Sequence, residues 1–264
     1  MKPSLRTLAV YLGFSRLAVS WVHPGILHNI ADLSRIKKLV ASKTQPWYEA
    51  YQAFAADSNS LLIYSFTGAC PVVTPDKNAN LIVCMGQFAS DSVAALQLAM
   101  MWTISGSTSY ADKATAILSG WGSTHTDDLP CSPGTDDQLA AALFGSNLVN
   151  AAEIIRYTYS GASYSGGWTA SSIDTFSTMV NDVLVPPASL TNSTPAVSYL
   201  FQANWGTSSE KFMLASAVFL ETPHFTTTPK NQFCIPPAPI CPVLFLPPAR
   251  APRAIAISSI RNLD

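Results

Sequence analysis

A polar amide and a large aromatic ring stand side by side at Asn204 and Trp205, directly before the stretch Gly-Thr-Ser-Ser-Glu. An Asn side chain donates through its NH2 group, so it can hold a polar ligand. A Trp face can pack against a ligand ring or against the core. Thr207 and Glu210 match a Thr-x-x-Glu capping box, which predicts a helix starting there. Because the box accounts less well for Asn204 and Trp205, these two are candidates for a polar binding wall as well as for ordinary capping.

A second polar group recurs along one predicted helix, at Asn147, Asn150, Glu153 and Arg156. Successive steps of three residues keep neighbouring side chains close on a helix surface. Asn147 and Asn150 could therefore line a cleft. We expect Glu153 and Arg156 to belong to a structural network between helices instead, as an ion pair spaced i,i+3.

The titratable residues show no metal-ligand spacing. His125 lies in the loop Gly-Ser-Thr-His-Thr-Asp-Asp and could reach a cleft, whereas His23, in a His-Pro-Gly motif, is expected to be structural. Asp136 and Asp137 are adjacent, and adjacent carboxylates do not point at one shared bond, so they give little support to acid–base hydrolysis. The 5 cysteines also lack a tight metal-binding spacing, and we expect no metal and no cofactor.

Composition is typical of a globular protein with a sizeable core. Of the 264 residues, 48% are apolar and only 12% are charged, with 15 basic against 16 acidic side chains. This balance leaves no electrostatic footprint for nucleic acid. Beyond the N-terminus, no run approaches the roughly 18 apolar residues that a membrane span needs. We therefore expect neither nucleic acid nor membrane as a partner. We also expect the protein to be a monomer.

The first 20 residues have the layout of a secretory signal peptide. Lys2 and Arg6 precede the apolar run 7–14, and the small residues Ala18-Val19-Ser20 offer a cleavage site. The alternative is an amphipathic first helix. We predict that residues 1–20 form a signal peptide and that the protein is secreted and extracellular.

Two further features have meaning in that compartment. Asn192-Ser193-Thr194 is an acceptor for N-glycosylation, which takes place on secreted chains. Cys70 and Cys84 could close a loop by a disulfide where conditions are oxidising. Asn192 is accordingly our predicted glycosylation site.

Apolar residues recur at helical spacing through most of residues 21–224, and we find no convincing strand alternation. The short Gly-Ser-Thr-Ser link after residue 105 predicts an antiparallel helix pair. Pro186 and Pro187 are expected to stop the helix before them. The predicted helices span residues 30–40, 46–54, 91–106, 108–120, 136–159, 169–185 and 207–220. The chain is therefore predicted to be all-α, with helical hairpins over residues 21–224.

Residues 225–264 differ in character, because they are rich in proline and have no sustained period. Each proline removes a backbone donor and disfavours helix before it. We predict an irregular or disordered Pro-rich C-terminal tail.

Five stretches, in this order, resemble the alginate lyase-like family of polysaccharide lyases that is found in secreted fungal and bacterial proteins. They are VHPGILHNIADLSRIKKLV, QPW, AALQLAMMWTISGSTSYADKATAILSGW, QLAAALFGSNLVNAAEIIR and NWGTSSEKFMLASAVFLE. The resemblance covers roughly residues 21–221. It implies an (α/α) toroid of antiparallel helical hairpins around a polysaccharide-binding cleft. It also implies β-elimination on a uronic-acid polymer such as alginate or a glucuronan.

The implied reaction explains which residue types are needed. A uronate carboxylate is a poor electron sink, so amide, guanidinium or imidazole donors must stabilise the charge that develops on it. A Tyr or His takes the proton from C5, and an acid protonates the departing O4. The resemblance marks Asn204 as the catalytic residue that holds the carboxylate. The substrate-binding candidates are Trp205, which offers a face for a sugar ring, Asn147, Asn150, His125 and Tyr199.

The resemblance ends near residues 221–223. Family members continue with further hairpins, including a segment with Arg, Asp and His that helps to build the active site, and here the Pro-rich residues follow instead. We therefore expect an incomplete toroid, truncated at its C-terminal side, that lacks part of the catalytic set. Two alternatives to a lyase stay open: a non-catalytic carbohydrate-binding remnant, and a glycoside hydrolase on a helical toroid.

Overall fold

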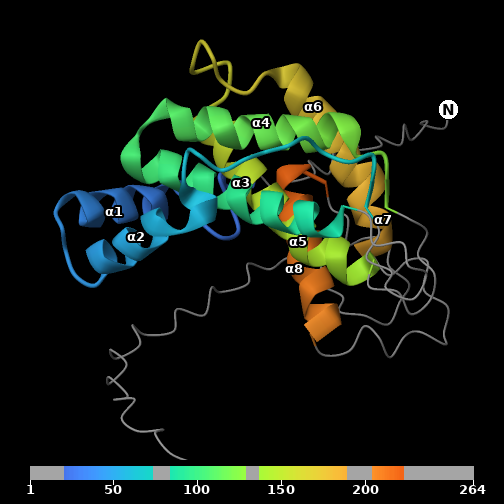
Figure 1. Cartoon of the computed structure of the whole chain (residues 1–264), viewed down its shortest axis with the longest axis horizontal. Helices are drawn as coiled ribbons and strands as arrows, with labels where there is room; N and C mark the ends of the chain where they lie inside the picture. The colour runs from blue at the N-terminus through green and yellow to red at the C-terminus, as the bar shows by residue number, and fades with distance from the viewer. Residues whose placement is uncertain (1–20, 74–83, 129–136, 189–203, 223–264) are drawn as a thin grey trace, which may run out of the picture. The chain divides into compact units, whose positions relative to one another are not determined.

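The protein is mainly helical in a computed structural model that describes residues 21–73, 84–128, 137–188 and 204–222 (Figure 1). These residues all fall in the first of two compact units, Met1–Pro229, and the second, Lys230–Asp264, lies outside them. The elements are α1 (Ile30–Ala41), α2 (Trp47–Ala56), the 3-10 turn η1 (Ser58–Ser60), β1 (Val72–Val73), α3 (Met85–Ser105), α4 (Thr108–Thr124), β2 (Asp127–Asp128), α5 (Asp137–Thr158), α6 (Ala170–Met179), the π-helical turn η2 (Val180–Leu184), α7 (Val185–Ala188) and α8 (Asn204–Phe219). The all-α prediction is confirmed at this level.

Local signals place several helix ends where the sequence predicts them. Asn29 caps α1, because its Oδ1 accepts a hydrogen bond from the backbone N of Asp32 at 2.9 Å. Gly106 ends α3 in the left-handed conformation, with φ 76°, where a side chain would be strained. Thr169 caps α6 through its bond from the backbone N of Ser172. These ends are local, so their residue types suffice to mark them.

Other predicted helix boundaries are wrong. Helix α3 begins at Met85 rather than at Asp91. Helix α8 begins at Asn204, so Thr207 and Glu210 lie inside the helix and do not form a capping box at its start. Pro186 and Pro187 do not stop the helical path.

Both prolines lie in the short helix α7, which follows directly on η2. Proline has no backbone N–H, so Pro186 and Pro187 donate no helical bond back to η2. The π-helical turn before them is closed by a bond from the backbone N of Val185 to the carbonyl of Val180. The chain thus changes helical pitch at this point instead of ending its helix.

Helices α3, α5 and α8 form one layer and run in the same direction. Between α3 and α5, Asn147 bonds Ser92 and Trp102 bonds Thr158, at nearly equal sequence separations of 55 and 56. Helices α5 and α8 also touch at two points, which follow in the same order along both helices. Gly145 lies against Phe212, and Arg156 bonds the carbonyl of Phe219.

Helices α4 and α6 form a second layer that runs in the opposite direction (Figure 1). The turn at Gly106 reverses the chain, and Trp121 Nε1 then bonds Asp91 Oδ2 at 3.0 Å, which pairs α4 antiparallel with α3. A methyl group on Gly122 would lie 2.9 Å from Phe176 Cα, so the backbones of α4 and α6 touch closely. The prediction of an antiparallel pair after residue 105 is confirmed.

The hairpin of α1 and α2 packs on one side of α3. Leu33 and Val40 bury the inner face of α1, whereas α2 has no buried residue. The chain then runs back along α3, where Ser60 bonds Gln97. The short strands β1 and β2 pair in parallel just before α3 and just after α4.

Large apolar side chains fill the space between the layers. The bulkiest of them that are fully buried are Trp121, Trp168, Phe88, Phe176, Phe212 and Phe219. Close packing at this density makes helix spacing sensitive to single methyl groups. Within the described part of the chain, no helix is both long enough and apolar enough to span a membrane.

Candidate functional site

The first turns of α3, α5 and α8 lie at one end of their layer. The helices run in the same direction, and their contacts join positions 55 or 56 apart between α3 and α5 and 63 to 67 apart between α5 and α8. With these offsets, Met85, Asp137 and Asn204 lie at nearly the same level along the helix axes, to within about one helical turn. Helix N-termini carry partial positive charge on their free N–H groups. The helix termini at this end of the layer, here called the N-terminal end, therefore favour an anion, whereas the charge of Asp137 opposes one.

Asn204 is the first residue of α8 and its side chain is exposed at that end. Its backbone carbonyl accepts a hydrogen bond from Ser208 Oγ at 2.7 Å, which ties the first turn together. Trp205 is half-buried, and Gly206 and Ser209 behind it are buried. The amide thus faces outward from a turn whose inner side is anchored in the core.

His125 lies close to the same end but is covered. It follows the last residue of α4, is 2% exposed, and its ring lies 5.6 Å from those of Phe88 and Trp121. The backbone N of the next residue, Thr126, bonds the carbonyl of Pro71 at 2.9 Å. The structure therefore places His125 beside Phe88 and Trp121 and away from the surface.

Asn147 and Asn150 lie deeper along α5. Asn147 is ten residues beyond the start of the helix, which corresponds to about 15 Å along its axis. Its Nδ2 bonds Ser92 Oγ at 3.4 Å, and Asn150 Nδ2 bonds the carbonyl of Ser146 at 2.8 Å. The two amides are thus engaged within the helical layer and are not grouped with Asn204. Tyr199 and Asn192 lie outside the described residues.

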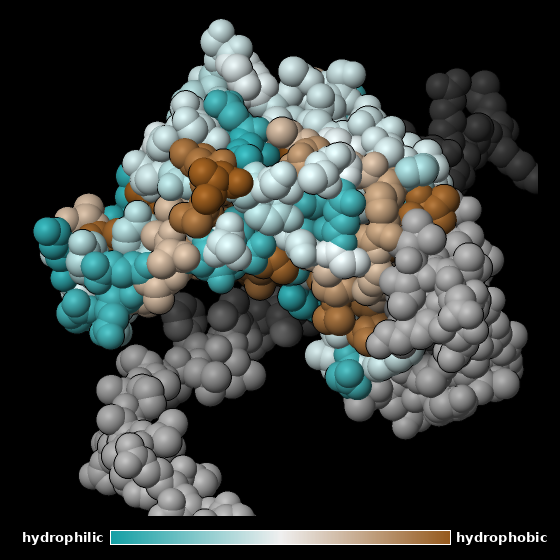
Figure 2. Space-filling model, viewed as in Figure 1, coloured by the Kyte–Doolittle hydropathy of each residue, from teal (hydrophilic) through white to brown (hydrophobic). Residues whose placement is uncertain are grey.

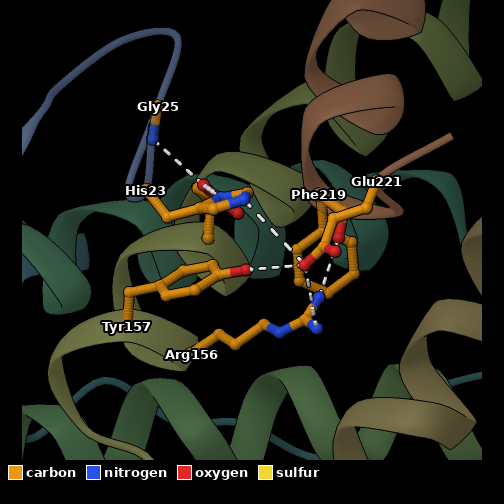
Figure 3. Close-up of polar contacts among 7 residues, drawn as sticks. His23, Gly25, Arg156, Tyr157, Phe219 and Glu221 are labelled. Carbon is orange, nitrogen blue, oxygen red and sulfur yellow. Dashed lines mark hydrogen bonds and ion pairs between the residues drawn. The ribbon is translucent and has the colours of Figure 1, made fainter. Parts of the chain in front are cut away.

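A dense polar cluster occupies the opposite end of α5 and α8 (Figure 3). His23 Nδ1 lies 2.6 Å from Glu153 Oε1, which also accepts the backbone N–H of Gly25 at 3.0 Å. The His23 ring stacks on Tyr157 with centroids 4.1 Å apart. Tyr157 Oη in turn donates to Glu221 at 3.1 Å.

Arg156 completes this cluster from the same helix. It donates to the carbonyl of Phe219 at 2.8 Å and lies 3.6 Å from Glu221. Glu153 and Arg156 each take partners from other segments, where the sequence predicted an i,i+3 ion pair between the two. The expected structural network is present, and it joins the His-Pro-Gly motif to the ends of α5 and α8.

Burial dominates the electrostatics of this cluster. It raises the pKa of Glu153, and the bonds from His23 and Gly25 and the charge of Arg156 offset only part of that increase. Glu153 Oε2 is buried without a hydrogen-bond partner. Burial also raises the pKa of Tyr157 to about 12. The hydrogen bonds and ion pairs of these groups tie the ends of α5 and α8 to the His-Pro-Gly motif.

Asp91 is a buried carboxylate that we did not identify from the sequence. Tyr64 Oη donates to it at 2.7 Å and Trp121 Nε1 at 3.0 Å, and burial raises its pKa. Asp91 shares a helical face with the buried residues Phe88 and Ala95, and an acidic residue on an apolar stripe was the available signal. Its bonds anchor residues 61–64 to α3 and α4, so its role is structural.

Among the described residues, no group of three or more His, Cys, Asp or Glu side chains could hold a metal ion. Comparison of the whole chain with protein-family models, with curated proteins and with solved structures found no match.

Proposed function

We propose that this protein is a secreted polysaccharide lyase of the alginate lyase-like type, which cleaves a uronic-acid polymer such as alginate or a glucuronan by β-elimination. The observation that carries the proposal is the exposed amide of Asn204 at the N-terminal end of three parallel helices. A uronate presents a carboxylate, and an amide donor beside helix N-termini suits that group.

Typical energies indicate that the amide donor would contribute more to the proposed reaction than the helix termini would. Each helix terminus contributes about 0.3–1 kcal/mol to a nearby anion at an exposed position, so the helix ends orient and attract the carboxylate only modestly. A single well-placed donor to charge that develops in the transition state is worth about 10²–10³ in kcat. In the proposed reaction, Asn204 is that donor, and Trp205 borders the sugar ring.

An incomplete (α/α) toroid is the fold that we propose for this chemistry. In a ring built from successive hairpins, every inner helix runs one way and every outer helix runs the other. The common direction of α3, α5 and α8, opposed by α4 and α6, supports that arrangement. The Pro-rich tail that we propose for residues 225–264 lies outside the described residues.

The disulfide between Cys70 and Cys84 supports the proposal of secretion, because such bonds persist in oxidising compartments. Cys70 lies at the end of the segment that runs back along α3, and Cys84 is the residue directly before α3. The proposed signal peptide and the glycosylation of Asn192 both concern residues outside the described part.

One observation favours a second candidate, a non-catalytic carbohydrate-binding protein with the same site wall. Of the predicted site residues that the structure describes, His125 is buried and the amides of Asn147 and Asn150 bond inside the helical layer. Asn204 therefore lacks a proton-transfer partner among them. A binding protein needs the amide and the aromatic ring but no base.

The two candidates differ in product formation. The purified protein is incubated with alginate and with polyglucuronate, and the ultraviolet absorbance of the unsaturated sugar end is followed. Absorbance that rises with time is expected for the lyase. Binding without absorbance would favour the binding protein, and new reducing ends without absorbance would indicate a glycoside hydrolase.

Asn204→Ala tests the assigned residue. Loss of a donor to the developing charge is expected to lower turnover about 10²–10³-fold. Lys211→Ala, an exposed change farther along α8, is the matched control and is expected to leave turnover unchanged. Near-normal turnover in Asn204→Ala, with the helical content retained by circular dichroism, would refute the role of this residue.

A further inference from the structure

Helix α2 presents an aromatic surface that core packing does not explain. None of its residues is buried, yet it carries Trp47, Tyr48 and Tyr51. Trp47 is 39% exposed, and Tyr51 lies one turn further along the same face. The Tyr48 and Tyr51 rings have centroids 6.4 Å apart and are tilted by 35°. We call Lys43 and these three aromatic residues the hairpin patch.

The surroundings of the hairpin patch are cationic. Arg35, Lys37, Lys38 and Lys43 lie between Asp32 and Glu49, and no acidic residue occurs in that interval. Arg35 is paired with Asp32, whereas Lys43 Nζ lies 5.9 Å from the centroid of the Tyr48 ring. Hydrophilic side chains gather over the α1–α2 hairpin, at the left in Figure 2.

Glu49 does not neutralise this face. At 100° per residue it projects from the side of α2 opposite Trp47 and Tyr51. The patch therefore combines an exposed cation with one exposed and two half-buried aromatic rings, a combination that suits an anionic sugar chain. A ring can stack on the apolar face of each pyranose, while the ammonium group meets the carboxylate.

We propose that the hairpin patch is a second binding surface for the uronic-acid polymer, separate from the site at Asn204. The identity of the polymer rests on the proposed function, and the presence of the surface rests on α1 and α2. The α1–α2 hairpin that carries the patch packs beside the later part of α3, since Lys37 Nζ on α1 lies 3.4 Å from where a side chain on Gly106 would begin. Asn204 lies at the level where α3 starts, so one long chain, but not a short oligomer, can contact both surfaces.

Trp47→Ala and Lys43→Glu test the surface by binding of the full-length protein to immobilised polyglucuronate and alginate. Each variant is expected to weaken polymer binding about tenfold, because one stacked ring or one charge reversal removes on the order of 1.4 kcal/mol. Tyr164→Ala, at an aromatic residue of equal 39% exposure in the loop between α5 and α6, and Lys211→Glu, at an exposed lysine on α8, are the matched controls. Both controls are expected to bind as the unaltered protein does.

Dextran serves as a neutral polymer and single-stranded DNA as a polyanion without uronate. If the protein binds neither dextran nor DNA, or binds DNA much more weakly than the uronate polymer, the proposal is supported. If it binds DNA as tightly as the uronate polymer, the proposal is overturned in favour of a nucleic-acid surface. Unchanged polymer binding by Trp47→Ala and Lys43→Glu, with unaltered thermal unfolding, would also overturn it.

The same variants separate this inference from the proposed lyase. If both proposals hold, Trp47→Ala raises KM for the polymer about tenfold and leaves turnover of a uronate trisaccharide unchanged. Binding that depends on Trp47, in a protein that forms no unsaturated product, keeps the surface and removes the lyase. If unsaturated product forms and the KM for the polymer does not change in Trp47→Ala or Lys43→Glu, the lyase proposal is supported and the second binding surface is ruled out. Failure to bind or cleave either polymer removes both.

Discussion

Replacement of Gly122 by alanine tests the close contact between α4 and α6, which holds the second layer together. An added Cβ would lie 2.9 Å from Phe176 Cα, 3.1 Å from its Cβ and 3.2 Å from its backbone N. Two of these three neighbours are backbone atoms, so no side chain can rotate away. The helices must separate locally, and Gly122→Ala is expected to destabilise the fold.

The magnitude follows from two opposing effects. Overpacking of a tight core contact costs about 1–3 kcal/mol. Alanine in a helix interior is favoured over glycine by up to about 1 kcal/mol. We therefore expect the free energy of unfolding to fall by about 1–2 kcal/mol, which lowers the melting temperature by several degrees in a domain of this size.

Urea unfolding followed by circular dichroism measures the change, and Gly86→Ala is the matched control. Gly86 lies in the first turn of α3, and an added Cβ there meets nothing within 4 Å. This variant is expected to be neutral or more stable, by up to about 1 kcal/mol. A Gly122→Ala protein as stable as Gly86→Ala, at an unchanged m value, would show that α4 and α6 are not in backbone contact.

Two other perturbations address the polar cluster and the disulfide. Because burial raises the pKa of Glu153 above its ordinary 4.5, the folded protein holds that proton more tightly than the unfolded chain does. The associated stability is present below that value and is lost as pH rises through the folded pKa. Relative to Glu153→Gln, the unaltered protein should therefore lose stability with rising pH in that window, and parallel pH profiles would contradict this. Reduction of the bond between Cys70 and Cys84, which are 14 residues apart, should lower the free energy of unfolding by about 3 kcal/mol. A Cys70→Ser, Cys84→Ser double variant should not respond to the reductant, and an equal response would assign the effect elsewhere.

Helix ends show how far local signals reach. The start of α1 at residue 30 and the end of α3 near Gly106 were predicted correctly, because a cap or a left-handed residue acts on the adjacent turn alone. The sequence left Asn29 and Asp32 as alternative caps of α1, and the structure shows that Asn29 is the cap. The start of α3 was missed, because residues 85–90 contain a glycine and follow no clear apolar stripe. Contacts of Phe88 with Trp121 and Phe144 favour helix there, and those partners are distant in sequence.

In the candidate site, too, sequence patterns identified some residues, whereas tertiary packing decided the place of others. Asn204 and Trp205 were identified from their types and their place before a predicted helix, and both lie in the first turn of α8. No local pattern indicated that His125 would be covered by Phe88, or that Asn147 would bond Ser92 on another helix. Burial depends on which helices become neighbours, and sequence spacing does not specify neighbours.

The sequence by itself determined the helices, most of their ends and the amide at Asn204, because periodicity, capping and side-chain chemistry are properties of short segments. Only the tertiary structure decided that α3, α5 and α8 run parallel with their first turns at one end, and that His23 joins Glu153 across 130 residues of chain. Such contacts depend on how apolar faces pack together, and many helix arrangements can bury the same stripes.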